Sequence, residues 1–318
     1  MVAVPMLSAV ARHPSDGFGS RALLFARSTV QAVTGLLVQS GLPALTYPTS
    51  LTRDIVPKSI HSHNDYWRQV PLFDALSYGC KSFEADIHLI DGSDELYVGH
   101  KKASLTSSRT LKSLYLDPLE EVLRMQNPIN ALATNETSGL INGVYDVDPS
   151  QSVQFILDYK TNGTSLHPVV LSYLQHYRDL ELLTTYDATT QSLTVRPVTV
   201  VCSGNCPIEL VQAQQPRDVF IDGPLLDLAS VDYGSEVAPL ASVSFRKLFG
   251  WAGVYDLTAD RVETVRSLVA TAHAKGIKVR FWETPSWPAF VRDHVWTTLL
   301  QNGVDWINAD NLHAASRI

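Results

Sequence analysis

The sequence is poor in cysteine, in basic runs and in long apolar stretches. Of its 318 residues, 3 are cysteines, and 25 Lys and Arg stand against 32 Asp and Glu, a formal net charge of −7. A nucleic-acid surface needs a basic patch or stripe, so this acidic balance excludes nucleic acid as a partner. No stretch reaches the roughly 18 consecutive apolar residues of a membrane span. We therefore expect no transmembrane segment.

The three cysteines are Cys80, Cys202 and Cys206. Cys80 lies among apolar residues, so we expect a buried thiol there. The run Cys202-Ser-Gly-Asn-Cys206 has neither a zinc-binding nor a redox-motif spacing. It can close a small disulfide loop, and the sequence alone leaves open whether it does.

The first fifty residues have a different charge balance from the rest. Three arginines stand there against a single acid, Asp16, among several Ser and Thr. This composition resembles an organellar transit peptide, whereas residues 2–11 can instead be read as a very short secretory core. Glycosylation sequons at Asn135 and Asn162 matter only in a secreted chain. We expect an N-terminal arm of weak order over residues 1–54, and a mitochondrial or secreted rather than a plain cytoplasmic location.

The remainder of the chain repeats a pattern of strand, loop and helix. Helical periods occupy residues 110–125, 260–275 and 287–302, and Gly276 and Gly303 stand where the last two should end. Several of the predicted strands are short apolar runs, typical of parallel sheets that are buried on both faces. The predicted strands are residues 55–62, 81–88, 153–159, 196–202, 218–222, 241–245, 277–282 and 305–308.

Eight strands separated by helices, with no break in composition, predict an α/β fold: a single (β/α)₈ TIM barrel over residues 55–318. A doubly wound open sheet is the alternative, but it needs a glycine-rich turn after the first strand, and none follows residues 55–62. Residues 130–150 are interpreted as a long loop on the functional face, and residues 184–195 as a hairpin inserted before the fourth strand.

Carboxylates gather where the second and third strands should end. Polar and apolar residues alternate over residues 83–89, so Glu84, Asp86 and His88 point to one face of a strand. Burying two carboxylates so close together is costly unless one is protonated or a cation lies between them. Asp158 ends the next strand and would add a third. An all-oxygen cluster of this kind favours a hard divalent ion, Mg²⁺ or Ca²⁺, over zinc. A solvated face on an edge strand is the simpler alternative.

Two histidines and a lysine accompany these carboxylates. Imidazole exchanges protons near neutral pH, so His63 and His100 are candidates for an acid and a base. Lys160 can hold a phosphate oxygen, or it can simply pair with the acid two residues before it. A cation, a lysine and two imidazoles around one cavity suit phosphodiester cleavage, in which one imidazole activates a nucleophile and the other protonates the leaving oxygen. His61 and His88 are interpreted as supporting residues.

Several motifs together resemble the phosphatidylinositol-phospholipase-C-like phosphodiesterases, a superfamily of TIM barrels. Within it the chain is most similar to the fungal family called altered inheritance of mitochondria protein 6, with relations to glycerophosphodiester phosphodiesterases and sphingomyelinase D. The resemblance spans about residues 55–312. The motifs are Ser62-His63-Asn64-Asp65-Tyr66, Glu84-Ala-Asp86, Leu96-Tyr-Val-Gly-His100, Phe281-Trp282-Glu283-Thr284-Pro285 and Gly303-Val-Asp305-Trp-Ile-Asn-Ala-Asp310.

The resemblance implies a metal site with one divalent ion, Mg²⁺ or Ca²⁺. Glu84 and Asp86 match the two ligands that these relatives carry on the second strand, and Asp158 matches the ligand on the third. Lys160 matches a lysine that binds the substrate in sphingomyelinase D relatives, so it joins the catalytic residues. The implied substrate is a small-molecule or lipid phosphodiester, phospholipid-derived or similar to a glycerophosphodiester, and a peripheral contact with a membrane goes with the lipid case.

The resemblance also implies catalytic and substrate-binding residues. His63 and His100 match the two catalytic histidines, although which one is the acid cannot be read from the sequence. Asn64 and Asp65 are assigned to substrate binding, together with Trp282, which falls where relatives place an aromatic wall of the cleft. The reaction is either hydrolysis or attack by a hydroxyl of the substrate that gives a cyclic phosphate. The sequence does not indicate an oligomeric state.

Two other functions are compatible with such a barrel. It can be a non-catalytic protein that binds phosphorylated headgroups or sugars. It can also be a glycosidase that uses two carboxylates on different strands, here Glu84 and Glu283. The glycosidase leaves Asp86, Asp158 and Lys160 without a role, which favours the phosphodiesterase.

Overall fold

A computed structural model describes residues 47, 49–128, 141–250 and 257–318. Residues 51–318 form the unit discussed below. Almost all of the predicted N-terminal arm, residues 1–54, lies outside the described residues. The same holds for half of the predicted loop 130–150 and for the sequon at Asn135.

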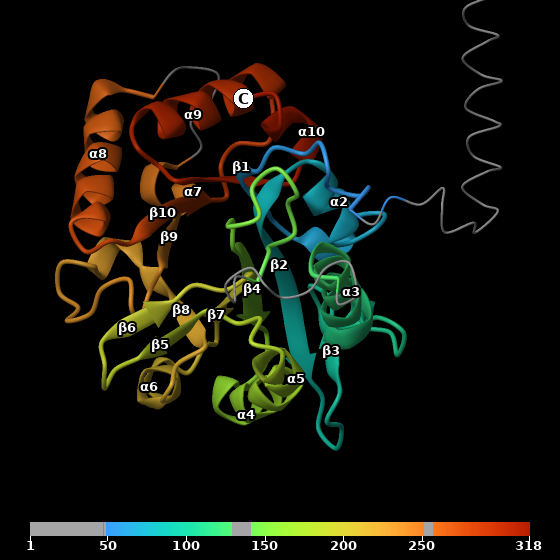
Figure 1. The fold of residues 1–318 in the computed structure, drawn as a ribbon. Coiled ribbons are helices and arrows are strands. Elements are labelled where there is room, and N and C mark those ends of the chain that lie inside the picture. Colours follow the sequence, from blue (N-terminus) through green and yellow to red (C-terminus); the bar gives the residue numbers. More distant parts are fainter. Residues whose placement is uncertain (1–46, 48, 129–140, 251–256) are drawn as a thin grey trace, which may run out of the picture. The chain divides into compact units, whose positions relative to one another are not determined.

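Eight parallel strands close into a barrel (Figure 1). In their order around the ring they are β1 (Lys58–Ser62), β2 (Cys80–Leu89), β4 (Val153–Tyr159), β7 (Val198–Gly204), β8 (Val219–Pro224), β9 (Leu240–Ser244), β10 (Lys278–Trp282) and β11 (Trp306–Ala309). β1 pairs with β2 on one side and with β11 on the other, so the ring has no open edge. The predicted (β/α)₈ barrel is confirmed.

Helices follow most of the strands and lie outside the ring (Figure 1). They are α2 (Phe73–Ser77), α3 (Asp117–Gln126), α4 (Gly163–Tyr173), α5 (Gln175–Asp179), α6 (Ile208–Ala213), α7 (Phe245–Phe249), α8 (Ala259–His273), α9 (Ala289–Gln301) and α10 (Leu312–Ala315). Gly276 and Gly303 adopt left-handed φ values of 71° and 87° just past α8 and α9, as expected for helix-ending glycines. Within the described ranges, no helix is both long and apolar enough to cross a bilayer.

Two short pairings and one disulfide add to the ring. β3 (Leu96–Val98) runs antiparallel to the end of β2. β5 (Thr185–Asp187) and β6 (Ser192–Thr194) form the hairpin expected before the fourth barrel strand. Cys202 and Cys206 are joined by a disulfide with their Cα atoms 5.6 Å apart, whereas Cys80 is a buried free thiol. The structure therefore decides the cysteine pairing that the sequence left open.

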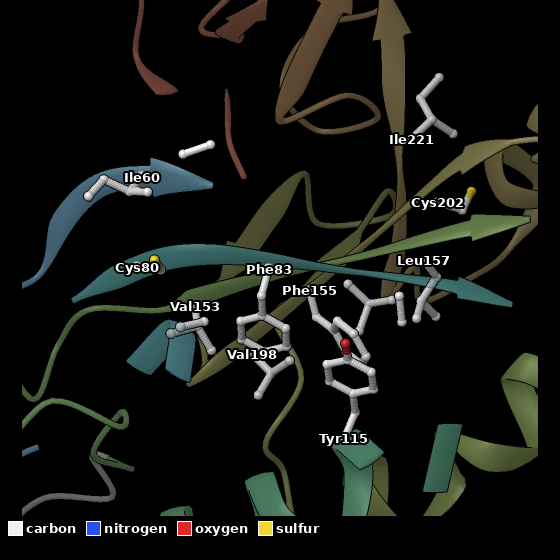
Figure 2. Packing of buried hydrophobic residues seen from close by; sticks show 14 of the residues in the cluster. Ile60, Cys80, Phe83, Tyr115, Val153, Phe155, Leu157, Val198, Cys202 and Ile221 are labelled. Carbon is white, nitrogen blue, oxygen red and sulfur yellow. The ribbon is translucent and has the colours of Figure 1, made fainter. Parts of the chain in front are cut away.

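The main core lies between the strands and the outer helices (Figure 2). Phe83 of β2 and Phe155 of β4 project outward side by side, with ring centroids 4.9 Å apart. Tyr115, from a π-helical turn at Lys112–Leu116, packs against both rings at 6.0 and 5.2 Å. These outward residues alternate with inward ones along each strand.

The inward residues change in character along the barrel axis. A small apolar cluster fills one level of the interior, formed by Ile156, Val201, Phe220, Leu240 and Trp306. Two residues further along β8 and β11, the inward positions are polar: Asp222 and Asn308. Arg280 of β10 contacts both of them and also Glu84 of β2. The interior is thus a packed apolar floor below a charged layer, and the charged layer faces the carboxyl ends of the strands, where barrel enzymes bind their substrates.

The aromatic core predicts the effect of removing one ring. Phe155→Ala should reduce the free energy of unfolding by about 3–5 kcal/mol, because it leaves a cavity between Phe83 and Tyr115. Phe290→Ala is the matched control: its ring is 63% exposed, so the change should stay within about 0.5 kcal/mol. Chemical denaturation of both variants measures the difference. Equal losses would contradict the packing described.

Candidate active site

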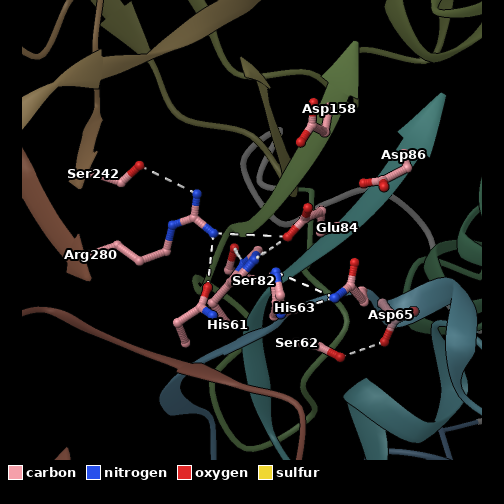
Figure 3. A network of polar contacts seen from close by, with 12 residues as sticks. His61, Ser62, His63, Asp65, Ser82, Glu84, Asp86, Asp158, Ser242 and Arg280 are labelled. Carbon is pink, nitrogen blue, oxygen red and sulfur yellow. Dashed lines mark hydrogen bonds and ion pairs between the residues drawn. The ribbon is translucent and has the colours of Figure 1, made fainter. Parts of the chain in front are cut away.

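Three carboxylates meet at the mouth of the barrel (Figure 3). Glu84 and Asp86 lie on β2, and Asp158 lies on β4, in direct register with Asp86. Strand alternation places all three side chains on the inner face. One oxygen atom of each lies within 4.8 Å of the other two. The structure therefore brings together the three residues that the sequence predicted as metal ligands.

Glu84 is held in place by buried partners on neighbouring strands. Its Oε2 lies 2.9 Å from His61 Nε2 and 3.9 Å from a guanidinium nitrogen of Arg280. Burial raises the pKa of Glu84, but the hydrogen bond from His61 and the nearby positive charges outweigh it, and the pKa falls below its ordinary value. Glu84 is therefore ionised although it is almost completely buried.

His61 supports this carboxylate as a neutral imidazole. Burial, with a smaller contribution from the charge of Arg280, lowers the pKa of His61 to about 3. Because Glu84 is ionised, the Nε2–H of His61 donates to it. Nδ1 then accepts from the hydroxyl of Ser82, 2.8 Å away. The predicted supporting role of His61 agrees with this geometry.

Asp86 is the most heavily contacted carboxylate of the three. Its Oδ2 accepts from the hydroxyl of Tyr66 at 2.7 Å and from Lys160 Nζ at 3.0 Å, and it lies 3.1 Å from His100 Nδ1. Burial and the charge of Glu84 raise the pKa of Asp86 to about 6, although Lys160 and Tyr66 partly oppose this. Its other oxygen, Oδ1, is buried and has no hydrogen-bond partner among the described residues.

That oxygen is the test of whether a metal fits. A buried, ionisable oxygen without a partner is unfavourable unless something else compensates its charge. Two further carboxylates lie beside Asp86, and the cluster offers oxygen atoms only, the donor type that Mg²⁺ and Ca²⁺ prefer. The residues present therefore fit one hard divalent ion, as the sequence predicted.

Lys160 lies between two of the carboxylates. Its Nζ is 2.8 Å from Asp158 Oδ2 and 3.0 Å from Asp86 Oδ2. Burial lowers the pKa of Lys160, but the charges of Asp158 and Asp86 outweigh it and raise the pKa, so the side chain is an ammonium. Burial also raises the pKa of Asp158, against the effect of Lys160. A fixed positive charge thus stands beside the cluster at the mouth.

His63 is oriented by a residue from the other end of the chain. β1 pairs with β11 so that Ser62 lies opposite Ala309, and the next residue of each strand follows at the mouth. His63 Nδ1 is 2.8 Å from Asp310 Oδ1. Burial lowers the pKa of His63, but the hydrogen bond with Asp310 and the charge of Glu84 reverse this and raise it above its ordinary value.

His100 reaches the mouth because β3 returns the chain along β2. The backbone N–H of Gly99 donates to the carbonyl of Asp86 at 3.0 Å, so the next residue, His100, lies beside that carboxylate. The imidazole is half-exposed, with Nδ1 turned towards Asp86. Trp67 packs edge-on against it at 5.5 Å between ring centroids. Both predicted catalytic histidines therefore turn Nδ1 towards a carboxylate.

The predicted substrate-binding residues are placed differently from one another. Asn64 is nearly buried, in a left-handed conformation with φ 48°, and its amide nitrogen lies 3.1 Å from His63 Nδ1. The hydroxyl oxygen of Tyr66 lies 2.5 Å from its side-chain oxygen. Trp282 is half-buried at the carboxyl end of β10. Neither position conflicts with contact to a substrate.

Asp65 does not occupy the substrate-binding position that the sequence predicted for it. It is completely buried, its Oδ1 accepts from Ser62 at 2.6 Å, and its Oδ2 accepts from the backbone of Leu72 at 2.7 Å and from Tyr115 at 3.1 Å. Both oxygens are thus occupied inside the protein, out of reach of a substrate. Asp65 fastens the loop that carries His63 and Asn64 instead.

Sequence reasoning missed four residues of the site. Tyr66 links Asn64 to Asp86, and Asp310 orients His63, although both stand inside motifs that the sequence analysis had noted. Trp67 packs on His100 from the same loop. Arg280 has the weakest signal: only the alternation of charged and apolar residues in β10 indicates that it points inward.

The closed barrel carries three carboxylates and two histidines at the carboxyl ends of its strands. A family model described as an AIM6-like phosphodiesterase domain matches residues 49–222, and the chain belongs to this family. The predicted family is thereby confirmed. The chain is 39% identical to the altered inheritance of mitochondria protein 6 homolog of Arthroderma benhamiae, over 86% of this chain and 87% of that one.

A second relative agrees with this membership. The chain is 34% identical to altered inheritance of mitochondria protein 6 of Eremothecium gossypii, over 86% of this chain and 73% of the relative. Among solved structures, it is similar to a glycerophosphodiester phosphodiesterase from Parabacteroides distasonis, with 12% identity and a TM-score of 0.47, covering 81% of this chain and 94% of that one. A phosphatidylinositol-specific phospholipase C from Listeria monocytogenes has 12% identity and a TM-score of 0.42, covering 87% and 96%.

The pairing of His63 with Asp310 predicts a change in titration. Asp310→Asn should lower the pKa of His63, because the hydrogen bond and the charge of Asp310 are lost and only the charge of Glu84 still opposes burial. Since the folded-state pKa is raised, the pair stabilises the fold fully below the ordinary value near 6.5, and this contribution is lost as pH rises through the raised value. Side-chain ¹⁵N–¹H NMR over a pH series measures the shift.

The matched control for this titration is Asp305→Asn. Asp305 accepts from His273 Nε2 at 2.8 Å, a second Asp–His pair with the same contact distance. Its removal should leave the titration of His63 unchanged. An unchanged His63 titration in Asp310→Asn as well would show that Asp310 does not control this imidazole.

Proposed function

We propose that this protein is a metal-dependent phosphodiesterase that cleaves a small-molecule or lipid phosphodiester by the acid and base chemistry of two histidines. The observation that carries the proposal is the position of Asp86. Its carboxylate belongs to the acidic cluster and at the same time contacts His100 and Lys160. A proton-exchanging group, a fixed cation and a cation-binding cluster therefore converge on one side chain.

In this proposal Glu84, Asp86 and Asp158 hold one Mg²⁺ or Ca²⁺. When bound, such an ion compensates the negative charge of the phosphate oxygens. Lys160 adds a fixed positive charge beside the cluster, and it is suited to bind a non-bridging oxygen of the substrate. His61 and Arg280 keep Glu84 ionised and limit its movement.

The two histidines act on the proton of the nucleophile and on the leaving oxygen. His63 presents Nδ1 to Asp310, and His100 presents Nδ1 to Asp86, so Nε2 of each ring is the atom that exchanges a proton with the substrate. One ring must be neutral to accept a proton while the other is protonated to donate one. The nucleophile is a water or a hydroxyl of the substrate, and the second gives a cyclic phosphate.

We further propose that the substrate is phospholipid-derived or similar to a glycerophosphodiester, and that the protein makes a peripheral contact with a membrane. Trp67 and Trp287 are 61% and 73% exposed, and they follow β1 and β10 at the mouth end of the barrel. Exposed aromatic rings are suited to a lipid interface. For the location we propose mitochondria or secretion: relatives carry the mitochondrial inheritance name, and a disulfide suits an oxidising compartment.

Metal binding gives the first test. Asp86→Ala should abolish binding of Mg²⁺ or Ca²⁺ in calorimetry, because it removes the ligand that also contains the buried unpaired oxygen. His88→Ala is the control from the same strand. The Nε2 of His88 contacts the carbonyl of Gly99 at 2.7 Å rather than the cluster, so its loss should only weaken binding. Equal affinity in wild type and Asp86→Ala would place the ion elsewhere.

The pH dependence of turnover gives the second test. The kcat/KM of the wild type should follow a bell whose two limbs belong to the coupled histidine pair. His63→Ala or His100→Ala should each cost on the order of 10²-fold or more, and the double variant much less than the product of the two losses. A substrate with a very good leaving group should rescue the variant that lacks the acid, and this assigns the two roles.

Phosphorus NMR of a mixed set of phosphodiesters, with and without the ion, identifies the substrate and the product. A cyclic phosphate separates internal attack from hydrolysis. If both single histidine variants keep near-normal rates on a confirmed substrate, the two-histidine mechanism is wrong. A protein that binds phosphodiesters without turning them over would instead be a headgroup-binding barrel.

A further inference from the structure

The disulfide closes a turn beside the acidic cluster. Cys202 is a buried residue of β7, opposite Leu157 of β4, and it packs with the core outside the barrel. Cys206 is half-buried and lies between the end of β7 and the start of α6. The turn between them holds Ser203, Gly204 and Asn205.

Gly204 of this turn lies directly against Asp158. In the register of β4 and β7, Ser203 is opposite Asp158 and Gly204 is opposite Tyr159. Gly204 has a left-handed φ of 64°, and a Cβ atom added to it would lie 2.0 Å from Asp158 Oδ1 and 2.9 Å from the carbonyl oxygen of Tyr159. The backbone of the turn therefore limits where the carboxylate of Asp158 can go.

The turn is also attached to the chain that leaves β4. The N–H of Asn205 donates to the carbonyl of Tyr159 at 3.0 Å. A Cβ atom on Gly163, the first residue of α4, would lie 1.8 Å from the carbonyl oxygen of Asn205. Both contacts involve the segment around Asp158 and Lys160, so the turn packs directly against the part of the chain that carries these two residues.

We propose that the disulfide-closed turn Cys202–Cys206 positions Asp158 for the divalent ion, so that metal affinity depends on the oxidised state of this cysteine pair. The inference rests on the proposed function, because it takes Asp158 as a ligand. With the link intact, Gly204 lies on one oxygen of Asp158 while Lys160 contacts the other. With the link open, the turn gains freedom and the carboxylate loses one side of its support.

The chemical change is a thiol–disulfide exchange with a dithiol reductant. The S–S bond of Cys202 and Cys206 accepts two electrons and two protons and becomes two thiols. The dithiol supplies both and becomes a cyclic disulfide. Partial exposure of Cys206 gives the reductant access, whereas Cys202 is buried.

Calorimetry with Mg²⁺ on the full chain tests the inference, before and after treatment with dithiothreitol. Reduction should weaken binding by about 10-fold to 100-fold, the range found for residues that support metal ligands, and reoxidation should restore it. Cys206→Ala should bind like the reduced wild type and should no longer respond to the reductant. Cys80→Ala, which removes the buried free thiol, should keep the full response.

A second pair of variants tests the contact without breaking the disulfide. Gly204→Ala places a methyl group against Asp158 and should weaken Mg²⁺ binding in the oxidised protein. Gly92→Ala is the matched control: it has a similar left-handed φ of 79°, but nothing lies within 4 Å of the added Cβ atom. Its affinity should equal that of wild type. This comparison tests the contact between the turn and Asp158 even if reduction unfolds the chain, and equal binding by the two variants would then overturn the inference.

The outcomes separate this inference from the proposed function. Equal Mg²⁺ affinity in the oxidised and reduced protein, or Gly204→Ala binding like Gly92→Ala, would overturn the inference and leave the metal site standing. Failure of the oxidised wild type to bind either Mg²⁺ or Ca²⁺ would overturn both. The positioning role is supported if Mg²⁺ binding weakens both after reduction and in Gly204→Ala, while Gly92→Ala binds like wild type.

Discussion

The main physical constraint on this structure is the electrostatic repulsion between three carboxylates at the mouth of the barrel. Glu84, Asp86 and Asp158 offer oxygen atoms within 4.8 Å of one another in a largely buried place, where like charges repel strongly. The protein itself compensates part of this charge. Arg280 and His61 contact Glu84, and the ammonium group of Lys160 contacts Asp86 and Asp158. The compensation is incomplete, since Asp86 keeps a raised pKa and an unpaired buried oxygen.

The architecture of the barrel makes this charge tolerable. An apolar floor closes the interior below the site, and the charged layer of Glu84, Arg280 and Asp222 stands above it in mutual contact. Each member is fixed by a partner on another strand, so no single loop holds the site together. A buried polar atom without a hydrogen-bond partner is tolerated where it serves binding or catalysis, and Asp86, Asp222 and Arg280 each have one here.

Much of the fold and site could be predicted because the relevant signals are local. Alternation over a few residues shows that Glu84 and Asp86 share a face, and the repeat of strands and helices predicts a parallel barrel. Cys202 and Cys206 show where local information ends. Their spacing permitted a disulfide, but only the register between β4 and β7 shows that the turn lies on Asp158.

By itself, the sequence determined the family, the barrel and the residue types of the site, since these follow from short periods and motifs. Tertiary structure decided which side chains meet. His63 and Asp310 are separated by 247 residues and touch only because the ring closes between β1 and β11. Asp65 looked like a substrate contact beside His63, yet the path of its loop turns it into the interior. A local sequence pattern describes residues that are neighbours along the chain. The burial of a side chain and its contacts across the barrel are decided only when the strands close the ring, because those contacts join segments that are far apart in the sequence.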